Sequence, residues 1–251
     1  MRRFLKLSYD GSPFNGWQRQ PNAPSVQQTL EEALAVLLRR ETPVTGAGRT
    51  DTGVNARVMY AHFDFDGDMP DRARMLRGLD RLCGPAIAVH DIIDVAPDAH
   101  ARFDATGRTY KYFVSLGKSP FDARFSWRSP SPLDMEAMNR AAALLTRTDD
   151  FTSFAKLHSD ARTNICRVSE ALWEEHVSPT GTPGLVFTIS ADRFLRNMVR
   201  AVVGTLVDVG RGKLSTDGFS DIIARKDRCA AGTSMPPQAL FLWDVKYPYL
   251  S

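Results

Sequence analysis

The chain has 251 residues, 43% of them hydrophobic and 24% charged, a composition typical of globular proteins with a sizeable core. Lysine and arginine total 32 against 29 acidic residues, and the resulting net charge of +3 is compatible with a polyanionic partner without indicating one. No apolar run of about 18 residues occurs and no apolar segment follows the first arginines, so we expect neither a membrane span nor export, and a cytoplasmic location.

The cysteines and histidines do not form a recognisable metal or disulfide pattern. Cys83, Cys166 and Cys229 are odd in number and widely spaced, which predicts buried free thiols rather than a disulfide framework or a zinc site. The five histidines are scattered, with no HExxH or comparable spacing, so we expect no bound metal.

The chain begins with a predicted strand and a predicted helix. Residues 2–9 alternate between apolar and polar side chains, as a half-buried strand does, and residues 10–25 contain too many Gly, Pro and Asn to be regular. Ser25 and Gln28 have the spacing of a capping box. A single apolar stripe follows and predicts an amphipathic helix: Val26, Leu30, Ala33, Leu34, Leu37 and Leu38.

Strands and helices continue to alternate through the first half of the chain. Residues 57–65 read as a strand, residues 71–83 as a helix and residues 86–95 as another strand. Residues 96–107 resemble a joint, after which the alternation resumes over residues 108–116. The order β-α-β-α-β predicts an α+β layer rather than a helical bundle.

The second half repeats this mixture and predicts two α+β halves, residues 1–104 and residues 105–251. Its predicted elements are a helix at 133–146, a strand at 184–190, a long helix at 191–210 and a strand at 239–247.

The predicted long helix carries an arginine-rich face. At 100° per residue, Arg193, Arg196 and Arg200 fall on the side opposite its apolar residues. A charged helix face is usually only solvated, but several arginines without an interspersed acid suit a phosphate or a carboxylate. This pattern favours a functional role for Arg200 and leaves Arg193 and Arg196 as substrate-binding candidates.

The segment "GAGRTDTGVNA", residues 46–56, surrounds one acid with glycine and positive charge. Asp51 has Arg49 before it and Arg57 shortly after it, in a loop that leads into the predicted strand at 57–65. Loops on a rigid frame often carry functional groups. The glycines do not fit GxGxxG, and Val54 and Asn55 replace the Lys-Ser/Thr pair of a P-loop, so neither phosphate-loop motif applies.

Three interpretations of Asp51 remain open from the residues alone. Asp51-Thr52-Gly53 spells the Asp-Thr-Gly of aspartic proteases, although the neighbouring arginine favours an ionised acid, whereas that dyad needs a protonated one. A single ionised aspartate acting as nucleophile or base is the second interpretation. The third is a structural turn that Asp51 closes onto its own backbone.

Several blocks of the sequence, in one order, resemble the TruA-type tRNA pseudouridine synthases. The loop is similar to the "GRTDAGVHA" signature of that family, and the likeness continues in "YDGSPFNGWQRQPNAPSVQQTLEEAL", "AHFDF", "HARFDATGRTYKY", "FLRNMVRAVVGTLVDVGRGK" and "PPQALFLWDVKY". The resemblance implies the pseudouridine synthase fold, with two α+β halves and mostly antiparallel sheets flanking a basic cleft.

The resemblance also implies roles for individual residues. Asp51 would be the nucleophile, Arg49 the arginine that displaces the target base, and Tyr110 the tyrosine that stacks on the uracil, whereas residue type alone would favour a core tyrosine. Arg200 would match an arginine near the catalytic aspartate. The chain departs from the family pattern at Thr52, where alanine is common, and at Asn55, where histidine is usual, which puts the contacts of residue 55 in question.

The implied reaction is an isomerisation of uridine to pseudouridine at positions 38, 39 and 40 of the tRNA anticodon arm, by a homodimer. Such a reaction has no redox step, so we expect no cofactor. An RNA-binding protein that kept the fold and lost the chemistry is the alternative, and Asn55 is the feature that encourages it.

Overall fold

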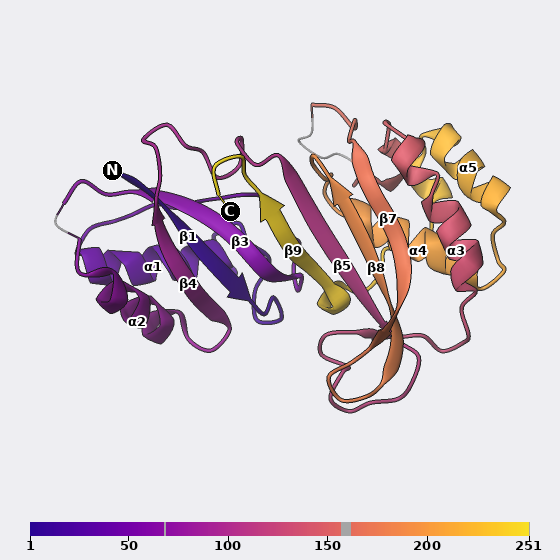
Figure 1. Ribbon diagram of the computed structural model, residues 1–251, viewed down its shortest axis with the longest axis horizontal. Coiled ribbons are helices and arrows are strands. Elements are labelled where there is room, and N and C mark those ends of the chain that lie inside the picture. The colour runs from indigo at the N-terminus through magenta and orange to yellow at the C-terminus, as the bar shows by residue number, and fades with distance from the viewer. Residues whose placement is uncertain (68, 157–161, 251) are drawn as a thin grey trace. The chain divides into compact units, whose positions relative to one another are not determined.

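The computed structural model describes residues 1–67, 69–156 and 162–250, shown in Figure 1. The chain forms two compact units, one of Met1–Thr106 together with the chain from Leu242 onward, the other of Gly107–Phe241. Each unit combines a largely antiparallel sheet with helices, so the α+β class predicted from the sequence is confirmed.

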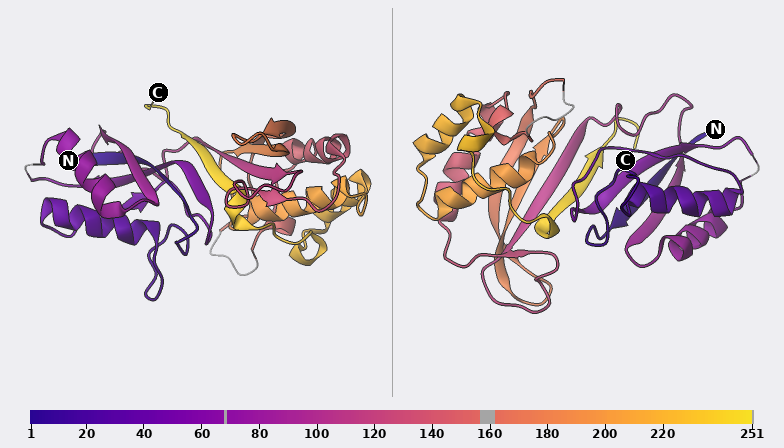
Figure 2. Two further views of the ribbon diagram at one scale, coloured as in Figure 1. Left: turned by 90° about the horizontal axis from the view of Figure 1, so that it is seen from below. Right: turned by 180° about the vertical axis from the view of Figure 1, so that it is seen from behind.

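The first unit is built around strand β1 (Arg2–Tyr9), which pairs antiparallel with β3 (Asn55–Asp64) and β4 (Ile87–Asp94). The short strand β2 (Thr45–Gly46) lies on the other side of β3. Helices α1 (Val26–Leu38) and α2 (Arg72–Cys83) cover one face of these strands, behind them in Figure 1 and in front of them in the reverse view of Figure 2.

Helix α1 begins where the capping pattern predicts. The hydroxyl of Ser25 accepts a hydrogen bond from the backbone N–H of Gln28 at 3.2 Å, but the Gln28 side chain donates to Glu32 instead of returning to the cap. The predicted apolar stripe is buried except for Leu37, which is half-buried, so this face anchors the helix to the core.

The last strand, β9 (Leu240–Lys246), carries the chain back into the first unit. The backbone N–H of Thr106 donates to the Lys246 carbonyl at 2.9 Å, and the Tyr247 hydroxyl donates to the Ala101 carbonyl. The division predicted at residue 104 assigns the final residues to the second half, whereas from Leu242 onward they pack in the first unit.

The second unit contains an antiparallel sheet in which β8 (Pro183–Ala191) lies between β5 (Gly107–Ser115) and β7 (Val168–Val177). The two-residue strand β6 (Trp127–Arg128) runs parallel to the end of β5. Tyr112, Phe187 and Trp173 face one another across the three strands and are buried. The remaining elements are helices α3 (Met135–Ala142), α4 (Met198–Gly210) and α5 (Thr216–Arg225), and short 3-10 helices at Leu145–Arg147, Thr152–Phe154, Arg228–Ala230 and Pro237–Ala239.

The prediction of one helix over residues 191–210 is wrong at its start, because α4 begins only at Met198. Strand pairing continues through Ala191, and the Asp192 carboxylate then accepts the backbone N–H groups of Arg193 and Arg167 at 2.7 and 2.8 Å. Asn197 follows in a left-handed conformation with φ 65°. The segment is therefore a strand end and a turn, and its apolar spacing reflects burial outside a helix.

Two of the longer elements, β7 and α5, have no counterpart in the sequence prediction. Strand β7 is an edge strand in which mainly Val168 and Trp173 are buried, so its apolar alternation is weak. Helix α5 is short and contains a glycine. Cys83 and Cys166 are buried, as predicted, and burial raises the pKa of their thiols to about 11 and about 12, but Cys229 is exposed.

Within the described ranges, none of the helices is both long and apolar enough to cross a membrane. The same residues contain no group of three or more His, Cys, Asp and Glu side chains arranged to hold a metal ion.

Candidate active site

Asp51 occupies the first position of a tight turn between β2 and β3. Its main-chain carbonyl accepts the N–H of Val54 at 3.1 Å, and Gly53 takes φ 75° at the third position, where glycine is favoured. The main chain therefore closes this turn. The Asp51 side chain is half-buried, whereas Thr50 and Val54 around it are buried.

The loop that follows β1 holds the Asp51 turn in place through main-chain hydrogen bonds. The N–H of Trp17 donates to the Thr50 carbonyl, and the N–H of Gly53 donates to the Phe14 carbonyl, both at 3.3 Å. Gly16 has φ 86°, and a Cβ there would lie 2.4 Å from the Thr50 carbonyl oxygen. The glycine-rich segment at 10–17 therefore serves as a close-fitting support for the candidate nucleophile.

Side-chain hydrogen bonds also hold this loop in place. The Tyr9 hydroxyl shares a buried hydrogen bond of 2.9 Å with the Thr50 hydroxyl. Asn55, the residue that departs from the family pattern, is 1% exposed, and its side-chain oxygen accepts the N–H of Gly11 at 2.8 Å. Asn55 therefore helps to fasten the glycine-rich segment to the start of β3.

Arg49 is exposed and precedes the turn, two residues before Asp51. Both residues lie in the first unit, whereas Tyr110 and the three candidate arginines, Arg193, Arg196 and Arg200, lie in the second.

Two tyrosines of β5 lie on one side of the strand but in different surroundings. Tyr112 is fully buried, and its hydroxyl donates to the Pro236 carbonyl at 3.1 Å; burial raises the pKa of this phenol far above its usual value. Tyr110 is half-exposed and meets the edge of Phe194, with ring centroids 5.0 Å apart and an interplanar angle of 88°. Tyr112 is thus the core tyrosine, and Tyr110 retains accessible surface.

Arg200 lies in the first turn of α4 and is half-buried. Its Nε donates to the Met235 carbonyl at 2.6 Å, and the N–H of Met235 donates back to the Arg200 carbonyl at 3.1 Å. The same segment receives the Tyr112 hydroxyl at Pro236, so one stretch of main chain fixes both side chains. Neither Met235 nor Phe194 carries a sequence signal that would have identified it as a neighbour of the candidate site.

Arg193 and Arg196 do not share a helix face with Arg200, because both precede α4. The Arg193 guanidinium donates to the Thr163 carbonyl at 3.3 Å, and the Arg196 carbonyl accepts the N–H of Lys156. The predicted arginine face is therefore wrong for Arg193 and Arg196, and of the three arginines only Arg200 lies on the helix.

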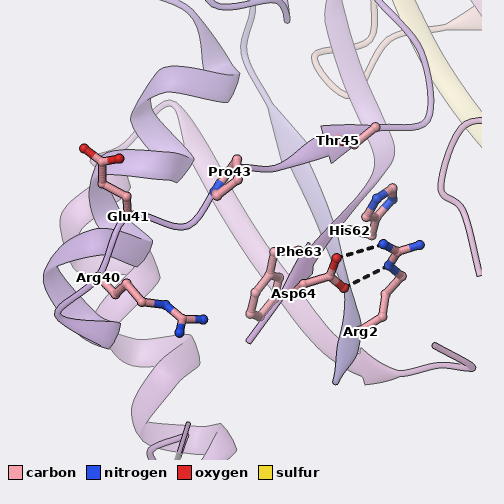
Figure 3. Close-up of a pocket in the computed structure, with 8 residues that line it drawn as sticks. All are labelled: Arg2, Arg40, Glu41, Pro43, Thr45, His62, Phe63 and Asp64. Carbon is pink, nitrogen blue, oxygen red and sulfur yellow. Dashed lines mark hydrogen bonds and ion pairs between the residues drawn. The ribbon is translucent and has the colours of Figure 1, made fainter. Parts of the chain in front are cut away.

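A separate cavity of about 470 Å³ opens in the first unit (Figure 3). Arg2 and Asp64 form a two-point ion pair beside it, at 2.9 and 2.8 Å, next to the buried His62. No candidate site residue lines this cavity, whose lining is Arg2, Arg40, Glu41, Pro43, Thr45, His62, Phe63 and Asp64. We therefore do not place the reaction in this cavity.

Each of these side chains offers its own chemistry. Asp51 presents a carboxylate on a rigid turn, and a fixed position reduces the reorganisation needed to reach a reacting atom. Tyr110 offers an aromatic surface together with a hydroxyl. Arg49 and Arg200 supply guanidinium groups, which are suited to anionic partners.

Comparison with known proteins shows the family of the chain. The model of the tRNA pseudouridine synthases matches residues 141–248. The chain is 53% identical over 247 residues to the tRNA pseudouridine synthase A of Bacteroides fragilis, covering 98% of this chain and 96% of that protein.

Two further relatives also match over nearly their whole length. Identity to the tRNA pseudouridine synthase A of Parabacteroides distasonis is 54%, over 99% of this chain and 97% of that protein, and identity to that of Geobacter sulfurreducens is 41%, over 97% and 98%. The chain belongs to the tRNA pseudouridine synthase family. These matches favour the synthase interpretation of the Asp51 loop over the aspartic protease interpretation.

Proposed function

We propose that this protein converts uridine to pseudouridine in the anticodon arm of tRNA, at positions 38, 39 and 40, with Asp51 as its nucleophile. The observation that carries the proposal is the 53–54% identity, over nearly the whole chain, to proteins named tRNA pseudouridine synthase A. The half-buried carboxylate on a firmly held turn supports the assignment of Asp51.

The reaction balances without an added reactant. The bond between uracil N1 and ribose C1′ breaks, a bond between C5 and C1′ forms, the C5 proton leaves, and N1 gains a proton. No atom is oxidised or reduced. Two routes satisfy this balance, attack of the Asp51 carboxylate on C1′ or on uracil C6, and both need the ionised acid.

The other site residues have complementary roles in this proposal. Arg49 displaces the target base from its stack, and Tyr110 stacks on the extruded uracil while its hydroxyl handles the C5 proton. Arg200 stabilises negative charge at the reacting centre. Arg193 and Arg196 contact the phosphates of the substrate.

A base must leave its stack before any side chain can reach it, which costs a few kcal/mol. Stacking on an aromatic ring contributes about 1–3 kcal/mol per base, so a half-exposed Tyr110 can offset a large part of that cost. In the same proposal the protein works in the cytoplasm as a homodimer, without a metal or cofactor.

The test uses tRNA labelled with tritium at uridine C5, which the reaction releases. Asp51→Asn should lower tritium release by at least about 10³-fold, as loss of a nucleophile does, while tRNA binding and thermal stability stay unchanged because the main-chain carbonyl closes the turn. Thr52→Ala, at an exposed position of the same turn, is the matched control and should keep its rate.

Two outcomes would contradict the proposal. Full tritium release by Asp51→Asn would remove this residue from the chemistry. Wild-type protein that binds intact tRNA yet releases no tritium and forms no carbodiimide-reactive pseudouridine would support the alternative of an inactive RNA-binding protein.

A further inference from the structure

The connection between β5 and α3 forms an unusual surface at one end of the second unit. Residues 116–131, here called the aromatic-basic loop, have the sequence LGKSPFDARFSWRSPS and include β6. In Figure 1 the loop lies below β5, beside the turn between β7 and β8. It carries three cations and one acid, Asp122.

The acid of this loop is engaged in fastening it. The Asp122 carboxylate accepts hydrogen bonds from the Thr180 hydroxyl at 2.9 and 3.0 Å and from the Ser178 hydroxyl at 3.1 Å. Hydroxyl donors, led by Thr182 and Ser119, lower the pKa of Asp122 to about 2. The loop is therefore tied to the β7–β8 turn as a folded structure.

Main-chain bonds complete the frame. The N–H of Phe125 donates to the Asp122 carbonyl at 3.0 Å, and the N–H of Ser129 donates to the Ser115 carbonyl at 2.9 Å. The N–H of Leu116 reaches the Pro183 carbonyl at 2.9 Å. A loop held at its start, middle and end presents its remaining side chains in fixed positions.

Those side chains are aromatic and cationic. Phe121 is 74% exposed and Phe125 is 40% exposed, with the Arg124 guanidinium 5.4 Å from the Phe125 ring centre. Lys118 and Arg128 are exposed on the same loop. A rigid loop that keeps a phenyl ring in water beside several cations forgoes burial of that ring, which is typical of a binding surface.

We propose that the aromatic-basic loop is a second RNA contact, in which Phe121 stacks on an unpaired base and Lys118 and Arg128 bind the flanking phosphates. Exposed rings beside guanidinium and ammonium groups match the two features of single-stranded RNA, base faces and phosphate charge. The excess of positive charge favours RNA over a second copy of this chain.

The loop acts away from the chemistry. It begins six residues beyond Tyr110 along β5, roughly 20 Å at the rise of a strand. A nucleotide bound there is not the target base, so the loop contributes to tRNA affinity rather than to the rate of isomerisation. This inference rests on the proposed function for the identity of the RNA.

The experiment measures tRNA affinity by fluorescence anisotropy across a salt series, together with tritium release at saturating tRNA. Phe121→Ala should weaken tRNA binding roughly 5- to 150-fold, and Phe121→Trp should restore it, because stacking needs only an aromatic face. Lys118→Ala with Arg128→Ala should lower the salt slope by roughly 0.7–0.9 per lost phosphate contact. Turnover at saturation should not change.

Matched controls come from the first unit. Val36→Ala removes a similarly exposed apolar side chain from α1, and Arg77→Ala with Arg81→Ala removes two exposed cations from α2. These variants should leave affinity and salt slope at wild-type values.

Unchanged affinity in both Phe121→Ala and the double cation variant overturns the proposal. A Phe121→Ala variant whose sedimentation shows a smaller assembly, with monomer affinity for tRNA intact, assigns the loop to self-association and also overturns it. Wild-type protein that releases no tritium would contradict the proposed function. Wild-type protein that releases tritium, together with loop variants whose tRNA affinity is unchanged, would contradict only this inference.

Discussion

The Asp51 turn and the region around Tyr110 and Arg200 are held by different means. Around Asp51, main-chain groups of residues 14–17 and 50–54 bond to one another, and glycines allow their close approach. In the second region, side chains donate hydrogen bonds to main-chain carbonyls, Arg200 to that of Met235 and Tyr112 to that of Pro236.

This difference shows which functional segments can be recognised from a short sequence motif alone. A loop built from backbone contacts needs particular residues in a short window, so it is recognisable as a signature. Side chains that depend on a distant segment do not reveal in their own sequence which of them is functional, as Tyr110 and Tyr112 illustrate.

The largest expected effect separates those two tyrosines. Tyr110→Phe should lower turnover by about 10²- to 10⁴-fold if its hydroxyl handles the C5 proton, with tRNA affinity retained. Tyr112→Phe should keep its turnover and lose only about 1 kcal/mol of stability, because one buried hydrogen bond to Pro236 is removed. Tritium release and urea denaturation of both variants measure the contrast, and equal turnover of the two would contradict the assignment.

The next effect separates Arg200 from the arginines outside α4. Arg200→Lys should lower turnover by about 10²- to 10³-fold, because an ammonium group does not reproduce the guanidinium that is anchored at Met235. Arg196→Ala should change turnover and tRNA affinity by no more than about fivefold, as expected for an exposed cation. A larger loss in Arg196→Ala than in Arg200→Lys would reverse the ranking.

A third effect tests the backbone support of Asp51. Gly16→Ala should destabilise the protein by about 2–4 kcal/mol and lower turnover about 10- to 100-fold, since φ 86° and a contact of 2.4 Å both oppose a side chain. Gly48→Ala meets no atom within 4 Å and is the matched control for stability. Chemical denaturation compares the stability of the two variants. Equal stability would show that the segment at 10–17 accommodates a side chain at residue 16 without cost.

The smallest effect concerns β3, which extends from the Asp51 loop. Burial, and next the charge of Arg2, lower the pKa of His62 to about 4. In the unfolded chain His62 binds a proton with the usual pKa of about 6.5. The contribution of the neutral, buried His62 to the free energy of unfolding is therefore fully present above pH 6.5 and is lost as the pH falls from 6.5 to 4. The loss should reach about 2–3 kcal/mol.

Denaturation at a series of pH values checks this expectation. His62→Gln should flatten the dependence, whereas His90→Gln, at an exposed position on β4, should leave it as in the wild type. An unchanged pH dependence in His62→Gln would assign the acid sensitivity to other groups.

The sequence predicted most of the fold where local signals are strong. Helix α1 has a cap and an apolar stripe, and the sequences of strands β1 and β3 alternate, so all three were found, although β3 is buried on both faces. The start of α4 was misplaced because the apolar spacing of residues 191–197 mimics a helix, while strand pairing through Ala191 and the Asp192 carboxylate impose a turn.

For the candidate site, the sequence supplies predictions of individual residues. The loop signature predicts Asp51 and Arg49, and the resemblance predicts Tyr110 and Arg200. Sequence alone could not show that Asn55 is committed to the N–H of Gly11, or that Arg200 is tied to Met235, because both contacts join segments more than 30 residues apart. The roles of these residues in catalysis remain predictions for the variants described above.

The return of the chain to its starting unit has a consequence for biosynthesis. Residues 107–241 leave the ribosome as a continuous segment that contains the whole second unit, whereas the first unit still lacks the part of β9 from Leu242 onward. The Thr106 bond to Lys246 and the Tyr247 bond to Ala101 form only after that strand emerges. During translation the amino-terminal unit of this protein is therefore completed last, and a nascent chain that stops before residue 242 leaves Asp51 in a unit that still lacks its final strand.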